Sequence, residues 1–174
     1  MPMRNPVLSS PTEPTVLGID PGASGALAIL SGREPVVFDC PTVQIKVGSK
    51  YRTRCDPNGM ARLLDAVLGL RNAHAFIEKV HANPKQGVSS MFTFGEAFGL
   101  WRGILAALRI PHTMVTPQAW KKGMMRGMTT EKDSSRARAM ELWPDMYEQL
   151  KRKKDDGRAE ALLIAEYGRR ELGL

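Results

Sequence analysis

The stretch TVLGIDPGASGALAIL, residues 15–30, decides the fold of this chain. Apolar residues at 16–19 and 26–30 predict two strands, and the PGASG segment between them predicts a tight turn, so the stretch is typical of a hairpin. Asp20 ends the first strand. An aspartate is disfavoured in a strand and is costly to bury unless it is paired or bound to a cation. Two other interpretations stay open from these residues alone: Asp20 caps the Pro-Gly turn, or the glycine-rich turn holds a phosphate.

Length and composition predict one soluble globular domain. The chain has 174 residues, of which 43% are hydrophobic and 25% are charged. We expect residues 1–14, rich in proline and serine, to be a loose tail, and residues 15–174 to form the single domain. The formal net charge of +7 favours an anionic partner, and nucleic acid is the most common one for a basic domain.

The cysteine and hydropathy patterns exclude several classes of protein. Cys40 and Cys55 are too few for a disulfide scaffold or a zinc cluster, so we expect free or incidental thiols in a reducing compartment such as the cytoplasm. No apolar run approaches the ~20 residues of a membrane span, and the first residues lack the apolar core of a signal peptide. We therefore expect no membrane association.

Further apolar patterns predict three more strands and several helices. The strands are expected at 34–39, 73–80 and 111–116, and the helices at 57–68, 91–108, 117–128, 129–142 and 159–167. The last helix has a strongly amphipathic pattern. Glycines at 95, 99 and 103 predict close packing of the 91–108 helix. Residues 41–57 are expected to form a polar loop.

Carboxylates recur where the predicted elements end or begin. Within the 73–80 stretch, residues 75–77 form the apolar part of the strand and Glu78 follows at its end, as Asp20 ends the first strand. Asp156 and Glu160 are four residues apart, so they share one helix face near the positive end of the helix dipole. A surface role for Glu78, and capping or ion pairing for the last two acids, are the structural alternatives. For the neighbouring Asp155 we prefer capping, because it points away from the Glu160 face.

These four acids together predict a metal centre. Asp20, Glu78, Asp156 and Glu160 come from three separated elements and would repel one another strongly without a counter-charge. Two divalent cations about 3.5–4 Å apart would neutralise them, one activating a water and the other stabilising the leaving oxygen of a phosphodiester. Oxygen ligands select Mg²⁺, with Mn²⁺ as a substitute, and the scarcity of cysteine and histidine disfavours zinc. We expect no small-molecule cofactor.

Basic side chains are expected to contact nucleic acid near Trp120, which could equally belong to the core. They are Lys121, Lys122 and Arg126. Lys132 falls in the first turn of a predicted helix, where the dipole disfavours a cation, so it indicates either a functional charge or a plain exposed lysine. Lys85 and Gln86 are expected to contact DNA from the polar loop 82–90. The basic residues of the 41–57 loop either contact phosphates or are simply solvated; they are Lys46, Lys50, Arg52 and Arg54.

Five segments of the sequence resemble those of one known family. They are VLGIDPGASGALAIL, AFIEKV, KQG with FGLW, EKDSSRA and KRKKDDGRAEALLIAEYG. These segments are similar to the RuvC-type Holliday junction resolvases, and the likeness is closest to the chloroplast resolvase subgroup. It runs from about residue 15 to residue 170, nearly the whole chain, and the last motif is highly specific.

The resemblance implies an α/β, RNase H-like fold with a mixed five-stranded sheet flanked by helices. It also implies a homodimer and magnesium-dependent, symmetrical nicking of four-way DNA junctions. The catalytic acids of the family fall on Asp20, Glu78, Asp156 and Glu160, and Lys132 matches a basic residue that would neutralise the pentacovalent phosphate. The chemistry also favours a dimer, because two symmetric nicks need two active sites related by a two-fold axis.

The chain departs from the family pattern at two places. Asp156 stands where the chloroplast relatives carry a histidine, and the bacterial relatives space their last two acids by three residues rather than four. At His81 the bacterial enzymes carry an aromatic wedge that this chain lacks, so we expect residues 86–92 to open the junction, with Phe92 either a wedge or a core residue.

Three other functions share parts of this pattern. An actin-like ATPase begins with a similar hairpin but needs a second, similar domain, for which the chain is too short. A nuclease of the same fold that acts on RNA, as in ribosomal RNA processing, is the enzymatic alternative. A catalytically silent module that only binds junctions is the non-enzymatic one.

Overall fold

The computed structural model describes residues 14–32, 34–67, 72–81, 87–127 and 133–174. The tail expected at 1–14 therefore lies outside the described residues, apart from Pro14. None of the described helices is both long enough and apolar enough to cross a lipid bilayer.

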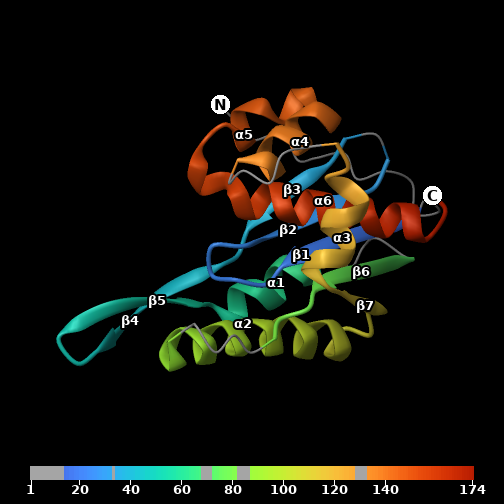
Figure 1. The fold of residues 1–174 in the computed structure, drawn as a ribbon. Coiled ribbons are helices and arrows are strands. Elements are labelled where there is room, and N and C mark those ends of the chain that lie inside the picture. Colours follow the sequence, from blue (N-terminus) through green and yellow to red (C-terminus); the bar gives the residue numbers. More distant parts are fainter. Residues whose placement is uncertain (1–13, 33, 68–71, 82–86, 128–132) are drawn as a thin grey trace, which may run out of the picture.

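A mixed five-stranded sheet, in the order β3-β2-β1-β6-β7, forms the centre of the structure (Figure 1). Its strands are β1 (Thr15–Asp20), β2 (Ala26–Leu30), β3 (Val36–Asp39), β6 (Ala73–Glu78) and β7 (His112–Val115). The central strand β1 pairs antiparallel with β2 and parallel with β6. The hairpin predicted from residues 15–30 and the mixed five-stranded sheet are thus confirmed.

Helices cover both faces of this sheet (Figure 1). One face carries α1 (Pro57–Val67) and α2 (Val88–Ala107). The other carries α3 (Pro117–Met124), α4 (Ser134–Leu142), α5 (Tyr147–Leu150) and α6 (Asp156–Glu171), with short 3₁₀ turns at Pro144–Met146 and Lys153–Asp155. Along β1, Val16 packs into the cluster that contains α6, while Leu17 and Ile19 pack into the cluster that contains α1 and α2. Because β1 is buried on both faces, its sequence is a continuous apolar run.

The helix α6 lies directly on the central strand. A Cβ atom at Gly18 of β1 would stand 2.1 Å from the backbone oxygen of Ala161 and 2.4 Å from the backbone nitrogen of Ala165, so only glycine fits there. The helix expected at 159–167 is confirmed. The exposed polar face that its amphipathic pattern predicts is wrong, because residues 161–166 are all buried. The reason is a second layer: α4 and α5 pack against α6 on the side away from the sheet (Figure 1).

The polar loop expected at 41–57 is wrong. These residues form an antiparallel hairpin of β4 (Thr42–Val47) and β5 (Lys50–Cys55), which extends away from the main sheet (Figure 1). Gly48 adopts a φ of 63° at the first position of the two-residue turn, a conformation that favours glycine. Cys40 and Cys55 meet at the base of the hairpin as free thiols, with their Sγ atoms 3.6 Å apart.

The close packing predicted from the glycines of α2 is not found within the described chain. A Cβ atom at Gly95, Gly99 or Gly103 would meet nothing within 4 Å. Phe92, on the same side of the helix by its spacing, is 71% exposed, so its core interpretation is wrong as well. The glycines therefore mark a bare helix face that the described residues leave uncovered.

Candidate active site

Asp20 lies at the carboxyl end of β1 in a strongly perturbed environment. Burial, followed by the charges of Glu160 and Glu78, raises the pKa of Asp20 from 3.8 to about 7. The backbone N–H of Gly22 donates a hydrogen bond to this carboxylate and acts in the opposite direction, as does the charge of Lys121. The turn-capping interpretation of Asp20 is therefore correct in part, but the cap leaves the carboxylate among other acids.

Glu78 is placed beside Asp20 by the parallel pairing of their strands. Ile19 of β1 is in register with Ile77 of β6, so the acids that follow them emerge at the same edge of the sheet. The indole Nε1–H of Trp120 donates a hydrogen bond of 2.8 Å to Oε1 of Glu78. Burial and the charge of Glu160 raise the pKa of Glu78, while this hydrogen bond opposes the rise.

Glu160 reaches the same site from the second turn of α6. Its Oε1 atom lies 3.2 Å from Nζ of Lys121 and accepts a hydrogen bond of 3.3 Å from the hydroxyl of Ser135. The ammonium of Lys121 also lowers the pKa of both Asp20 and Glu78. Three of the four predicted acids therefore converge, with one lysine as their counter-charge.

Asp156 faces a different partner in the structure. Its Oδ1 atom accepts a hydrogen bond of 2.7 Å from Nε of Arg136, whose side chain is only 10% exposed. Arg136 also donates to Asp133 and, at 3.1 Å, to the backbone oxygen of Lys151. The predicted helix face is correct, since Asp156 and Glu160 both contact α4, but Asp156 is held there in an ion pair.

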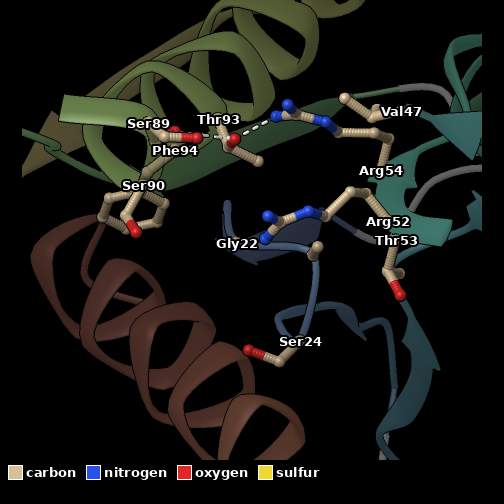
Figure 2. A pocket seen from close by; sticks show the side chains of 11 residues that line it. Gly22, Ser24, Val47, Arg52, Thr53, Arg54, Ser89, Ser90, Thr93 and Phe94 are labelled. Carbon is tan, nitrogen blue, oxygen red and sulfur yellow. Dashed lines mark hydrogen bonds between the residues drawn. The ribbon is translucent and has the colours of Figure 1, made fainter. Parts of the chain in front are cut away.

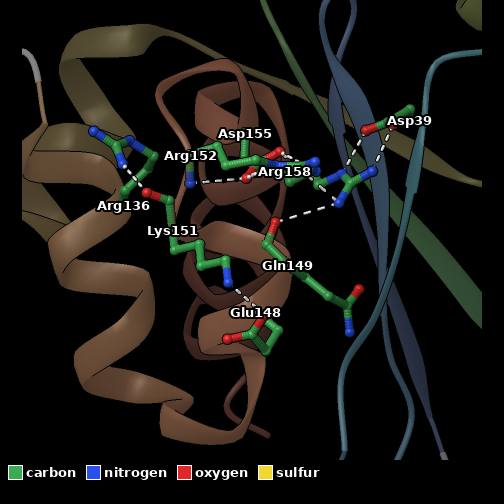
Figure 3. A network of polar contacts seen from close by, with 8 residues as sticks. All are labelled: Asp39, Arg136, Glu148, Gln149, Lys151, Arg152, Asp155 and Arg158. Carbon is green, nitrogen blue, oxygen red and sulfur yellow. Dashed lines mark hydrogen bonds and ion pairs between the residues drawn. The ribbon is translucent and has the colours of Figure 1, made fainter.

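Asp155 belongs to a separate network at the start of α6, shown in Figure 3. Its side chain is 2% exposed and accepts hydrogen bonds from the backbone N–H of Arg152, at 2.9 Å, and from the guanidinium of Arg152, at 3.0 Å. Arg158 in turn donates two hydrogen bonds to Asp39 at the end of β3. These contacts tie the start of α6 to the sheet. The capping of α6 preferred for Asp155 from the sequence is wrong, because its side chain makes no cap hydrogen bond to α6 and instead binds Arg152 across the preceding 3₁₀ turn.

The chemistry of the donor set fits a hard divalent cation. Asp20, Glu78 and Glu160 supply carboxylate oxygens only, and the raised pKa values of Asp20 and Glu78 mean that a nearby positive charge would be favourable. In the arrangement observed, however, no three acidic, histidine or cysteine residues of the described chain are grouped as ready-made metal ligands. Trp120 and Lys121 instead hold Glu78 and Glu160, so a bound cation would compete with Lys121 for its carboxylate.

The predicted basic residues are only partly described. Lys121 lies at the acids, and Lys122 and Arg126 are exposed near α3. Lys85, Gln86 and Lys132 lie outside the described residues. Sequence reasoning missed the roles of Trp120 and Arg136 as hydrogen-bond donors to predicted site acids. No local motif signals these pairs, because they form only when α3 and α4 pack onto the site.

An open groove of about 710 Å³ borders the turn that follows Asp20, as Figure 2 shows. The turn that follows Asp20 forms one side, and the β4–β5 hairpin and the start of α2 form the others. Arg52 extends from β5 toward Gly22, while the guanidinium of Arg54 donates a hydrogen bond to the hydroxyl of Thr93 on α2. The groove thus runs from a basic hairpin to the turn that follows Asp20.

Comparison with known proteins identifies the fold. The structure of RuvC from Thermus thermophilus in complex with a Holliday junction substrate matches with a TM-score of 0.59 and 14% sequence identity, covering 92% of this chain and 96% of that one. A second Thermus thermophilus RuvC structure matches with a TM-score of 0.53 and 16% identity, covering 90% and 96%. No family model and no curated protein sequence matches the chain. The expected RNase H-like fold is confirmed.

Proposed function

We propose that this chain is a structure-selective DNA endonuclease that resolves four-way junctions by paired, symmetrical nicks. The observation that carries the proposal is the convergence of Asp20, Glu78 and Glu160, from β1, β6 and α6, at one edge of an RNase H-like sheet. Burial of mutually repelling carboxylates opposes folding, so their presence favours a role in binding a cation. The finer likeness to the chloroplast resolvases rests on the sequence motifs.

In this proposal Asp20, Glu78 and Glu160 hold Mg²⁺ or Mn²⁺ beside the scissile phosphate. A bound divalent cation would lower the pKa of an attacking water and neutralise charge on the phosphate. The carboxylates orient the cation, and the hydrogen bond from Gly22 fixes the carboxylate of Asp20. Asp156 is the proposed fourth ligand and would have to exchange Arg136 for the cation.

Two lysines are proposed to act on the charges of the site. Lys121, 3.2 Å from Glu160, compensates the acids and is released toward the DNA phosphate when the cation binds. Lys132 is proposed to stabilise the pentacovalent phosphate, as the family motif implies.

The groove beside the turn that follows Asp20 is the proposed path of one DNA strand. Arg52 and Arg54 line it and suit phosphate contacts, because an arginine can bind a phosphate with two hydrogen bonds. Lys122 and Arg126 would hold a second DNA arm, with Lys85 and Gln86 at the junction centre. Affinity that depends on these contacts should fall steeply as the salt concentration rises.

A homodimer would supply the second active site. The bare face of α2 suits this contact, because Gly95, Gly99 and Gly103 recur every fourth residue and would let a second helix approach closely. Phe92 lies at one end of this face and is 71% exposed. In this arrangement it would stand close to the two-fold axis and is a proposed wedge for the junction.

Cleavage of a four-way DNA junction tests the proposal. Each strand is labelled in turn and incubated with the protein and Mg²⁺ or Mn²⁺; we expect nicks at symmetric positions on two opposing strands. Asp20→Asn should bind the junction and fail to cut it. Asp65→Asn, which alters an exposed acid of α1, is the matched control and should cut normally.

Parallel substrates separate the alternatives. Four-way RNA and linear DNA of the same sequence are included, and cutting of RNA alone would replace the resolvase with an RNA nuclease. The silent junction-binding module is favoured by one observation, namely that no three ligands are pre-grouped among the described residues. Junction binding without cutting by the wild type, with either metal ion, would establish that alternative.

A further inference from the structure

Trp120 is fully buried, yet it contacts Glu78, one of the acids of the site. It lies in the middle of α3, whose start is fixed by Pro117 and by the side chain of Thr116, which accepts a hydrogen bond from the backbone N–H of Ala119 at 3.2 Å. This short helix packs against α6 and places the indole at the end of β6. There the Nε1–H group lies 2.8 Å from Oε1 of Glu78.

Burial alone does not explain this pairing. Trp101 of α2 is equally buried, on the opposite face of the sheet, and its Nε1–H has no acceptor among the residues that the structure describes. Within the described part of the chain, one fully buried indole N–H therefore stands without an acceptor. A carboxylate placed against the other indole calls for a reason beyond satisfying a buried donor.

The chemistry of the pair gives that reason. An indole N–H can only donate, so it binds a lone pair of Glu78 and restricts rotation of the carboxylate. Oε1 is engaged by this bond, and Oε2 is the oxygen left for another partner. The face of the same indole lies 5.0 Å from Nζ of Lys121, the residue that holds Glu160. One side chain therefore contacts both the acid of β6 and the counter-charge of the acid on α6.

We propose that Trp120 is a positioning residue, which fixes the carboxylate of Glu78 for a divalent cation through its Nε1–H and never touches DNA. This inference rests on the proposed function, because it assigns Glu78 to a metal site. Residues that orient a metal ligand from behind typically change metal affinity or activity by about 10–100-fold when the hydrogen bond is removed. A residue with only a packing role would not change either quantity in this way.

Trp120→Phe tests the inference, with Trp101→Phe as the matched control. Both substitutions remove an indole N–H from a fully buried tryptophan, but only Trp120 donates to a site acid. We expect Trp120→Phe to weaken Mn²⁺ binding by about 10–100-fold in calorimetry without DNA, and to lower kcat by a similar factor. The KM for the four-way junction should stay unchanged, because the residue is buried. Trp101→Phe should match the wild type in all three measurements.

A spectroscopic measurement on the wild type covers the case in which Trp120→Phe does not fold. Addition of Mg²⁺ should shift the indole ¹H–¹⁵N resonance of Trp120 and leave that of Trp101 in place. The absence of a shift at Trp120, or equal Mn²⁺ affinity and kcat in the two variants, would overturn the inference.

The outcomes also separate the two proposals. A wild type that cuts junctions while Trp120→Phe behaves as Trp101→Phe contradicts only the role of Trp120. A wild type that binds Mg²⁺ with a shift at Trp120, but does not cut, contradicts only the proposed function.

Discussion

Replacing Asp20 with asparagine should remove much of the pH dependence of stability that the acidic site creates. Burial and the charges of Glu160 and Glu78 raise the pKa of Asp20 from 3.8 to about 7. Since one pKa unit corresponds to about 1.4 kcal/mol, ionising Asp20 costs the folded state about 4 kcal/mol at neutral pH and above. Asp20 keeps partial contact with solvent, which makes this value an upper limit.

The direction follows from proton binding in the two states. Between pH 3.8 and about 7 the folded chain retains a proton on Asp20 that the unfolded chain has released, so the free energy of unfolding falls as pH rises. Above this window both states are ionised and the contribution is constant. The raised pKa of Glu78 adds a fall of the same sign. Asp20→Asn should match the wild type near pH 4 and exceed its stability by up to about 4 kcal/mol near pH 8.

Urea unfolding across this pH range, with a chelator present, measures the effect. Asp65→Asn, a change at an exposed acid, should follow the wild type at every pH. Addition of Mg²⁺ near pH 8 should then stabilise the wild type more than Asp20→Asn, because the cation binds the folded state. Parallel stability curves for the wild type and Asp20→Asn would refute the reasoning, since Asp20 would then not be the group that titrates.

Three further predictions concern the frame of the site. Gly18→Ala should destabilise the fold by roughly 4 kcal/mol or more, because its Cβ would stand 2.1 Å from a backbone oxygen of α6; a cooperative thermal transition close to that of the wild type would contradict this. Arg136→Met should lower the free energy of urea unfolding by about 2 kcal/mol, because Asp156 loses an ion pair of 2.7 Å; an unchanged value would show that solvent replaces the pair. Arg52→Gln combined with Arg54→Gln should reduce the salt slope of four-way junction affinity, measured by fluorescence anisotropy, by roughly two, and an unchanged slope would place the DNA elsewhere.

The centre of the fold was predictable because its signals are local. The residues before Asp20 are apolar at successive positions, which predicts a strand buried on both faces. A carboxylate that ends such a strand lies where the strand leaves the sheet, whichever strands pair with it. The same rule placed Glu78, and helical spacing placed Asp156 and Glu160 on one face of α6. These inferences need only the period of an element and the position of its end.

The errors arose where one pattern has two meanings. A glycine can permit close packing, as Gly18 of β1 does where α6 lies on it. The glycines of α2 instead mark a bare helix face. Strand β4 alternates apolar residues such as Val43 with polar ones such as Gln44, but all of its residues are exposed, so the hairpin lacks the buried stripe by which strands are recognised. A Val-Gly-Ser-Lys turn between alternating β-branched residues was the available signal for it.

Partners of the site residues could not be predicted because they depend on tertiary packing. Spacing gives the face of α6 but not what lies opposite, and the structure places Arg136 against Asp156 and Lys121 against Glu160. The sequence around Trp120 fits either a core residue or a functional one. In the structure Trp120 is both, since it is fully buried and donates a hydrogen bond to Glu78. This double role depends on the packing of α3 near the end of β6.

The distance between the acids is set by the backbone. Gly18 lets α6 lie on β1, and at Gly157 a Cβ would stand 2.2 Å from the backbone oxygen of Ser24, so the first turn of α6 also approaches the β1–β2 turn closely. These contacts bury Asp20 and bring Glu160 close to it, and both effects raise the pKa of Asp20, burial the more strongly. Lys121 offsets only part of this rise, since the pKa remains near 7. A chain with neutral residues at these positions would keep the same packing and be more stable at neutral pH, so the acids are better explained by cation binding than by folding.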